Sequence, residues 1–130
     1  MDIEALKPKI AEIAIKHGLD FVVLFGSQAI GRTHPKSDVD IGVISKSKFD
    51  ILKVMTDLDN AFGRGDVNAV DLSRASPTLM RAIVVDGKLL YERERAMFLR
   101  WKFYAIRVWM ETAWLRELGQ KRLIEWAKQI

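Results

Sequence analysis

Two short groups of residues, separated by ten other residues, have the types and spacing needed for phosphate and metal chemistry. Gly26 and Ser27 form the first group, and Asp38 and Asp40 form the second. A Gly-Ser turn after a strand offers backbone N–H groups to a phosphate. Carboxylates two residues apart on a strand share one face, about 6–7 Å from each other, and can converge on a metal ion. Together the groups predict metal-assisted phosphoryl or nucleotidyl transfer.

Two apolar runs must position these residues. Residues 21–25 end directly before Gly26, and residues 38–44 contain Asp38 and Asp40. Both runs have the length and composition of strands with one or two buried faces. Either group alone would also suit an ordinary turn or a solvated strand edge. The combination favours a site, because two acids beside an apolar strand need a positive partner, and Mg²⁺ meets that need.

The pattern Gly-Ser, ten residues, Asp-x-Asp resembles the minimal nucleotidyltransferases of the DNA polymerase β superfamily, of the kind encoded beside HEPN toxins and called MntA antitoxins. The resemblance covers about the first 90 residues, and its elements agree in order and context. It implies that Asp38 and Asp40 are catalytic metal ligands. It further implies that Asp71 supplies a third carboxylate from a later strand. Gly26 and Ser27 would bind the phosphates of the nucleotide.

The loop between the two groups matches the same family in part. Arg32 follows Gly31 and corresponds to the second basic position of the pattern, where it would bind phosphate oxygens as a planar fork. One departure is visible, because relatives carry arginine directly after Gly-Ser and this chain has Gln28. Lys36 and His34 suit a solvated loop and are assigned no contact. The resemblance therefore implies one basic phosphate ligand from this loop.

Two functions follow from the resemblance. In the first, the chain binds ATP with two Mg²⁺ ions and transfers a nucleotidyl group, AMP, to a hydroxyl of a partner protein. The acceptor would be a tyrosine of a HEPN toxin, which the transfer would neutralise. In the second, the chain is a non-catalytic antitoxin or assembly subunit that occludes its partner. The presence of Asp38, Asp40 and Asp71 favours catalysis, since a steric partner has no need of three inward acids.

The rest of the first 91 residues predicts an α/β domain. Apolar residues recur at helical spacing over residues 3–17, where Gly18 ends the helix and His17 is expected to interact with its last carbonyls. They recur again over residues 49–62, where Ser47 and Asp50 resemble a capping box that opens the helix. Ser76 begins a third helix that reaches about residue 85. Two further strands are expected at residues 67–72 and 88–91. This order indicates a mixed sheet with flanking helices, the polymerase β-like arrangement. We assign residues 1–91 to a nucleotidyltransferase core and residues 92–130 to a helical extension of the same compact domain.

The extension is predicted to contain one long helix over residues 95–118, because no proline or glycine occurs before Gly119. Six aromatic residues lie in it, and it is apolar around more than one face. Its free face would bind a second copy of the chain or the toxin, unless residues 120–130 fold back and cover it. Aromatic residues with methionine and arginine are typical of interface centres, which favours binding.

Composition excludes several other classes of protein. With 130 residues the chain is one domain, and it contains no cysteine for a disulfide framework or a thiolate metal site. No apolar stretch is long enough for a membrane span, and the N-terminus lacks the pattern of a signal peptide. We therefore expect a cytoplasmic protein. The net charge of +4 arises within residues 92–130 without a clustered basic run, so no specific nucleic-acid binding is expected.

Overall fold

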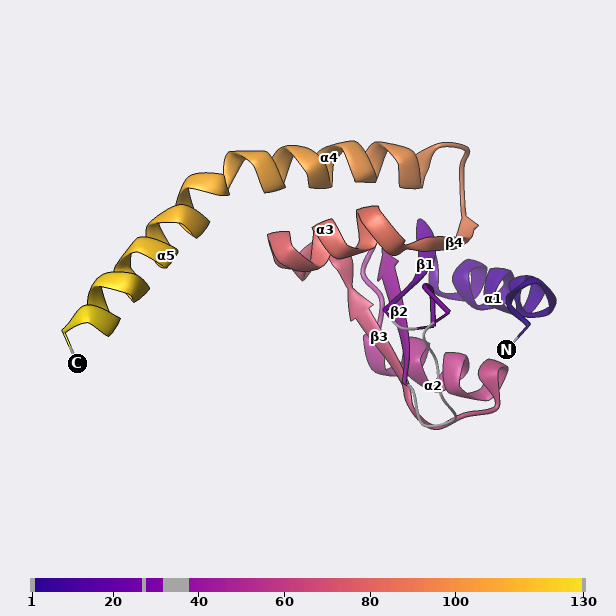
Figure 1. Ribbon diagram of the computed structural model, residues 1–130. Helices are drawn as coiled ribbons and strands as arrows, with labels where there is room; N and C mark the ends of the chain where they lie inside the picture. The colour runs from indigo at the N-terminus through magenta and orange to yellow at the C-terminus, as the bar shows by residue number, and fades with distance from the viewer. Residues whose placement is uncertain (1, 27, 32–37, 130) are drawn as a thin grey trace.

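The computed structural model describes residues 2–26, 28–31 and 38–129 of the chain. Its helices and strands alternate through most of the sequence (Figure 1). In chain order they are α1 (Ile3–His17), β1 (Phe21–Phe25), β2 (Val39–Ile44), α2 (Ile51–Phe62), β3 (Val67–Asp71), the 3-10 helix η1 (Leu72–Arg74), α3 (Pro77–Asp86), β4 (Lys88–Glu92), α4 (Met97–Glu111) and α5 (Ala113–Lys128).

The four strands form one mixed sheet in the order β3-β2-β1-β4. β1 runs antiparallel to both of its neighbours, and β2 runs parallel to β3. The parallel pair requires a crossover, which α2 provides. The predicted mixed α/β sheet is therefore confirmed, including all four strand positions.

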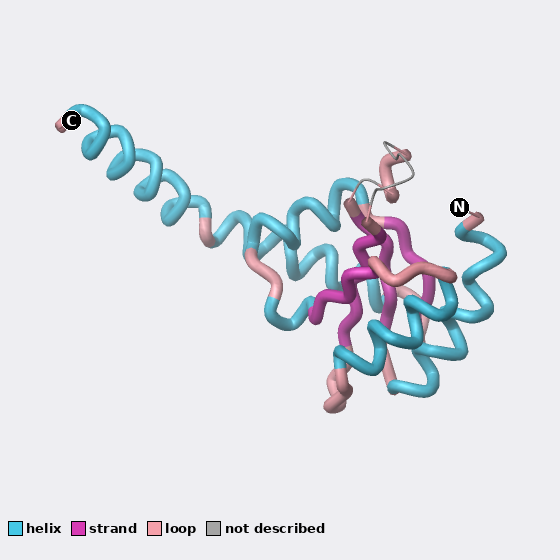
Figure 2. The backbone as a smooth tube through the Cα atoms, turned by 90° about the horizontal axis from the view of Figure 1, so that it is seen from below, coloured by secondary structure: helices cyan, strands magenta, loops and turns pink. Residues whose placement is uncertain are grey.

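Helices cover both faces of the sheet (Figure 2). α1 and α2 pack on the face that carries Val39, Ile41 and Val43 of β2. α3 and α4 pack on the opposite face, where β1 presents Phe21, Val23 and Phe25. Because successive side chains of a strand point to opposite faces, the even-numbered residues of β2 must lie on the α3/α4 side. Asp40 is one of them.

Side-chain caps explain where the helices begin. Ser76 accepts a hydrogen bond from the N–H of Leu79, as expected for the start of α3. α2 begins later than the predicted Ser47, because Asp50 caps the N–H groups of Leu52 and Lys53. Gly18 ends α1 in a left-handed conformation with φ of 67°, as the sequence predicts.

From its position in the sequence, His17 is expected to interact with the last carbonyls of α1. Among the described residues it contacts Asp57 of α2 instead. Its Nε2 lies 2.7 Å from Oδ2 of Asp57 on α2. Hydrogen bonds from His17 and then from Lys16 hold the pKa of Asp57 below its usual range. The contact ties α1 to α2 on the outer side of the sheet.

The predicted C-terminal helix is present, but it is not one continuous helix over residues 95–118, because it breaks at Thr112. The hydroxyl of Thr112 donates to the carbonyl of Val108 at 2.7 Å, and Arg116 donates to the same hydroxyl at 2.9 Å. Arg116 also donates to the carbonyl of Trp109 at 2.7 Å. Threonine bonding back to the preceding turn bends helices, and here it separates α4 from α5. Gly119, the predicted end, lies within α5.

The two C-terminal helices differ in what they bury. α4 buries Phe98, Trp101 and Ala105, and the rings of Phe98 and Trp101 lie 5.3 and 5.8 Å from that of Phe21. α5 buries no residue and projects away from the sheet (Figure 1). The alternative in which residues 120–130 fold back over α4 is therefore excluded for residues 120–129. Within the described ranges, no helix is long and apolar enough to cross a membrane.

Gly42 provides a test of how closely the α3/α4 face is packed. A Cβ atom there would lie 2.9 Å from Cδ2 of Leu72 and 3.0 Å from Cγ1 of Val23. We expect Gly42→Ala to lower the free energy of unfolding by about 1–3 kcal/mol through overpacking. Urea denaturation measures the change, with Gly65→Ala as the control because a Cβ there meets nothing within 4 Å. Equal stability of both variants would contradict close packing at Gly42.

Candidate active site

The second acid of the Asp-x-Asp motif, Asp40, lies near the beginning of β2 on the α3/α4 side of the sheet. Asp38 directly precedes the strand and is exposed, whereas Asp40 is half-buried within it. Asp40 is paired with Phe25, the last residue of β1, and with Asn68 of β3. The acids therefore stand at the end of the sheet where β1 finishes and its following turn begins.

Gly26 lies directly against Asp40. It has φ of +76°, and a Cβ atom built on it would be 2.5 Å from Oδ2 of Asp40. Its carbonyl accepts a hydrogen bond of 3.1 Å from the N–H of Ala29, which closes the turn after β1. Only glycine suits both the left-handed backbone and the close approach of the carboxylate. The structure thus brings together one residue of the Gly-Ser pair and one of the acid pair.

Two predicted nucleotide ligands cannot be placed. Ser27 and Arg32 lie outside the described residues, as do Lys36 and His34 of the same loop. Gln28, which stands where relatives carry arginine, is described and is half-buried in the turn. Among the described residues, the phosphate-binding side of the site is therefore represented by Gly26 and its turn.

Asp71 is not brought to the other acids. In the pairing of β2 with β3, Asp71 lies opposite Val43, whereas Asn68 lies opposite Asp40. Asp71 is therefore three residues further along the strands than Asp40. It also shares the α1/α2 face of β3 with Val67 and Ala69, so the sheet lies between its side chain and Asp40. Its Oδ1 accepts from the N–H of Ser73 at 3.0 Å and from the hydroxyl at 2.8 Å. In this structure Asp71 caps η1.

The residue beside Asp40 on β3 is Asn68. Its Nδ2 donates to Oδ1 of Asp40 over 3.5 Å, and the side chain is exposed. The sequence interpretation missed this position because it looked for an acid, and Asp71 is the acid within the run. The signal was available in the alternation of β3, since Asn68 and Asp71 are an odd number of residues apart and cannot share a face.

A second residue that the sequence interpretation missed is Arg64. Its guanidinium binds both carboxylate oxygens of Asp66, with Nε to Oδ1 at 2.7 Å and Nη2 to Oδ2 at 2.8 Å. The hydrogen bond to Asp66 raises the pKa of Arg64, and the nearby charge of Asp38 raises it further. In return, Arg64 holds the pKa of Asp66 below its usual value. Arg64 is thus paired with Asp66, and the charge of Asp38 acts on it more weakly.

The donors at this site suit a hard cation that arrives with a nucleotide. Mg²⁺ is commonly bound through one or two carboxylates together with substrate phosphates and water. Asp38 and Asp40 provide two such carboxylates, next to the Gly26 turn that would carry the phosphates. In the part of the chain that the structure describes, no group of three His, Cys, Asp or Glu residues could hold a metal. The described residues fit a cation shared with phosphate and do not form a complete metal cage.

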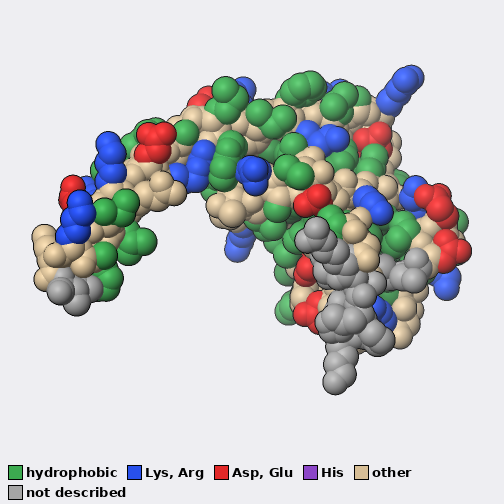
Figure 3. All heavy atoms as spheres, in the orientation of Figure 1, with side chains coloured by type: hydrophobic (Ala, Val, Ile, Leu, Met, Phe, Trp, Pro, Cys, Tyr) green, Lys and Arg blue, Asp and Glu red, His purple; other side chains and the backbone are tan. Residues whose placement is uncertain are grey.

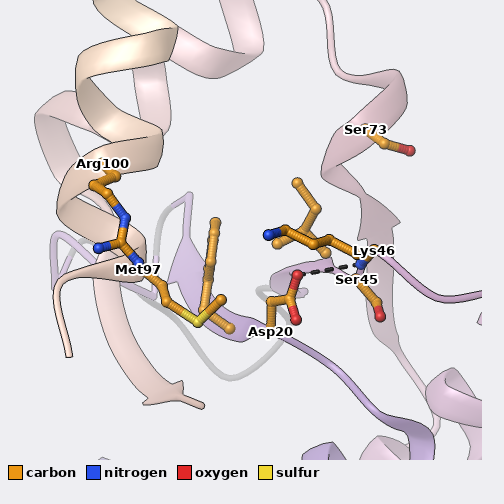
Figure 4. A pocket seen from close by; sticks show the side chains of 8 residues that line it. Asp20, Ser45, Lys46, Ser73, Met97 and Arg100 are labelled. Carbon is orange, nitrogen blue, oxygen red and sulfur yellow. Dashed lines mark hydrogen bonds between the residues drawn. The ribbon is translucent and has the colours of Figure 1, made fainter. Parts of the chain in front are cut away.

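A separate cavity of about 260 Å³ lies at the other end of the sheet (Figure 4). It is lined by residues from the start of β1, the end of β2 and the first turn of α4, among them Lys46 and Arg100. The carboxylate of Asp20 in its wall accepts from the N–H of Lys46 at 3.1 Å and pairs with Arg93 at 3.1 Å. These contacts join the segments after β2 and β4, so we read the cavity as structural.

Comparison with known proteins identifies the family. The profile of the polymerase beta nucleotidyltransferase family matches residues 8–96. The chain belongs to this family. The resemblance noted from the sequence is therefore confirmed at the level of family and fold.

Two relatives carry related names. Protein adenylyltransferase MntA of Shewanella oneidensis is 35% identical over 80 residues, which cover 56% of this chain and 54% of that protein. The match thus spans about half the length of the relative. A candidate protein adenylyltransferase of Methanocaldococcus jannaschii is 31% identical over 87 residues, which cover 65% of this chain and 92% of that protein.

Solved toxin–antitoxin structures extend the likeness beyond residues 8–96. A chain in the crystal structure of a toxin–antitoxin with AMP-PNP has a TM-score of 0.76 and 26% identity, covering 91% of this chain and 98% of that one. A chain from tri-AMPylated Shewanella oneidensis HEPN toxin in complex with MNT antitoxin has a TM-score of 0.75 and covers 95% and 99% of the two chains. At 22% identity, the second comparison supports the fold alone.

The contact between Gly26 and Asp40 predicts a specific effect of a methyl group. We expect Gly26→Ala to displace the Asp40 carboxylate and weaken binding of Mg²⁺ and ATP. Gly31→Ala is the matched control, because Gly31 has a similar φ of +73° but a Cβ there meets nothing within 4 Å. Both variants should lose about 1–2 kcal/mol of stability from the left-handed backbone. Calorimetric titration with ATP and Mg²⁺ separates them, and equal loss of affinity would argue against the contact.

Proposed function

We propose that this chain is a protein adenylyltransferase that binds ATP with Mg²⁺ and moves AMP onto a hydroxyl of a HEPN-type toxin, so acting as its antitoxin. The observation that carries the proposal is the packing of Gly26 against Asp40, which joins a phosphate-binding turn to a metal-binding carboxylate. Membership of the nucleotidyltransferase family and the names of the relatives support the same activity. Because ATP is the donor, we place the activity in the cytoplasm.

In this proposal the two ends of the site have different tasks. The turn at Gly26 receives the triphosphate through its backbone, with Ser27 and Arg32 as further phosphate ligands. Asp38 and Asp40 hold the cation that accompanies the nucleotide, and bound Mg²⁺ would neutralise charge on the phosphates. The acceptor hydroxyl approaches from the side of Asp38, which is exposed at the beginning of β2.

The helical extension supplies the surface for the toxin. Large apolar side chains are exposed along both α4 and α5, and Figure 3 shows hydrophobic side chains gathered along the two helices. Phe103 is 65% exposed, Met110 70% and Trp114 60%. Exposed apolar surface of this kind marks protein interaction sites rather than monomer surface. The solved complex of a HEPN toxin with an MNT antitoxin, whose fold this chain shares, makes a HEPN-type toxin the partner that we propose.

The charge of the helical extension suits an acidic partner surface, and the half-buried position of Asp40 suits a tyrosine as the acceptor. The excess of positive charge lies in residues 92–130, so a partner with an acidic contact surface would associate faster. A tyrosine hydroxyl at the end of a long side chain can reach a half-buried carboxylate such as Asp40 while the partner backbone stays outside the site. In this proposal, residues 1–91 form the catalytic core and residues 92–130 the docking extension.

A second candidate function is a non-catalytic antitoxin that occludes its partner through α4 and α5. The observation that favours it is the position of Asp71, which leaves the site without the third carboxylate that the family resemblance implied. Both functions use the same docking surface, and they differ in whether AMP is transferred. Binding without transfer would select the second.

The catalytic function is tested by the two acids. We expect Asp38→Ala and Asp40→Ala each to abolish AMP transfer, because each removes a proposed ligand of the cation. The fold should remain, because neutral substitution relieves repulsion between neighbouring carboxylates. Transfer is measured with labelled ATP, Mg²⁺ and a HEPN toxin as acceptor. Asp86→Ala, an exposed acid at the end of α3, serves as the control and should transfer at the wild-type rate. Wild-type rates in both site variants would exclude the catalytic assignment.

The docking surface is tested by its tryptophans. We expect Trp114→Ala to weaken association with the toxin by about 2 kcal/mol or more, because exposed aromatic anchors concentrate binding energy. Trp101 is 7% exposed, so Trp101→Ala should instead lower the melting temperature. Sedimentation and calorimetric titration with the toxin measure association. Unchanged affinity in Trp114→Ala would remove that residue from the interface.

A further inference from the structure

Asn68 occupies the position from which a third metal ligand would have to come. In the parallel pairing of β2 with β3, Asp40 and Asn68 are register partners, and side chains of register partners lie on the same face. The amide is close enough for Nδ2 to donate to Oδ1 of Asp40 over 3.5 Å. No other residue of β3 stands beside Asp40 on this face.

The two acids nearest to Asn68 in the sequence cannot supply a third metal ligand in its place. Asp71 lies on the opposite face of the sheet, where its carboxylate caps η1. Asp66 precedes β3, and both of its oxygens are held by Arg64 at 2.7 and 2.8 Å. The described residues therefore direct two carboxylates, those of Asp38 and Asp40, toward this part of the sheet.

We infer that Asn68 takes the place of the third carboxylate, so that this chain binds the divalent cation that accompanies the nucleotide and lacks the ligand for tight binding of a second cation. An asparagine can offer a neutral carbonyl oxygen, but in this structure its amide nitrogen faces Asp40. The affinity of carboxylate sites for divalent cations depends on the number of charged ligands. A site with two carboxylates holds a second cation weakly.

The same amide also affects the protein without metal. By donating to Asp40, Asn68 offsets part of the negative charge at the beginning of β2. An aspartate at this position would face Asp40 as a like charge, which disfavours the metal-free state and favours cation binding. The inference rests on the proposed function for its nucleotide, but the binding of cations can be measured without any acceptor or transfer.

The experiment counts Mn²⁺ bound to the full chain in the presence of AMP-PNP, an ATP analogue, by electron paramagnetic resonance. The wild-type protein should bind one Mn²⁺ tightly per nucleotide site, and Asn68→Asp should bind two, with the second at least about tenfold tighter than in the wild type. Thermal unfolding in EDTA adds a second readout. There Asn68→Asp should melt below the wild type, and Mn²⁺ should raise its melting temperature more.

Two further variants make the result decisive. Asn68→Ala should keep one tight Mn²⁺, because the first cation is held by Asp38, Asp40 and the phosphates. Asp71→Asn should lower the melting temperature by weakening the cap of η1 and leave the Mn²⁺ count unchanged. The inference is overturned if the wild type already binds two cations equally tightly, if Asn68→Asp adds none, or if Asp71→Asn loses one.

These outcomes separate the inference from the proposed function. If no AMP is transferred to a toxin but the Mn²⁺ count rises in Asn68→Asp, the inference stands and the adenylyltransferase proposal fails. If AMP is transferred by the wild type and the Mn²⁺ count does not change in Asn68→Asp, the proposed function stands and the role of Asn68 fails.

Discussion

The alternation of side chains along β2 is the constraint on which the site depends. One set of residues, Val39, Ile41 and Val43, is buried against α1 and α2. That burial fixes the strand in one register, because a shift by one position would move the apolar set to the other face. Asp40 is thereby held on the α3/α4 side, and Asp38 lies two positions before it. The site is positioned by apolar residues that take no part in its chemistry.

The close approach of Gly26 to Asp40 adds a second constraint, which acts between strands. β1 and β2 are antiparallel, so the end of one meets the beginning of the other, and the turn after Phe25 lies over the pair of acids. A side chain at Gly26 would occupy the space of the carboxylate. The hairpin itself thus brings the Gly26 turn and the Asp40 carboxylate together.

Much of the fold could be predicted from the sequence because it depends on local patterns. The four apolar runs became strands, and Gly18 and Ser76 mark a helix end and a helix start where predicted. The break at Thr112 could not be predicted, because it depends on a threonine hydroxyl and on Arg116 from the following helix. Large apolar residues continue the helical pattern on both sides of Thr112, with Trp109 and Met110 before it and Trp114 and Leu115 after it.

The candidate site was predictable only in part. Asp38, Asp40 and Gly26 follow from spacing, since the two groups flank one hairpin. The neighbour of Asp40 on β3 depends on the register between two strands joined by a long crossover, and no local pattern determines that register. Asn68 was therefore missed, and Asp71 was selected because it is the acid in the run. Arg64 was missed because a turn sequence does not reveal the charges that face it.

The order of the strands has a consequence for the chain during its synthesis. β1 is an inner strand, but its neighbour β4 is made more than sixty residues later, and α4, which covers Phe21, is made later still. Until then, a nascent chain presents an unpaired edge and the uncovered rings of Phe21 and Phe25, which is the kind of surface that chaperones shield and that aggregates recruit. α5 buries nothing, so the core is complete without that helix.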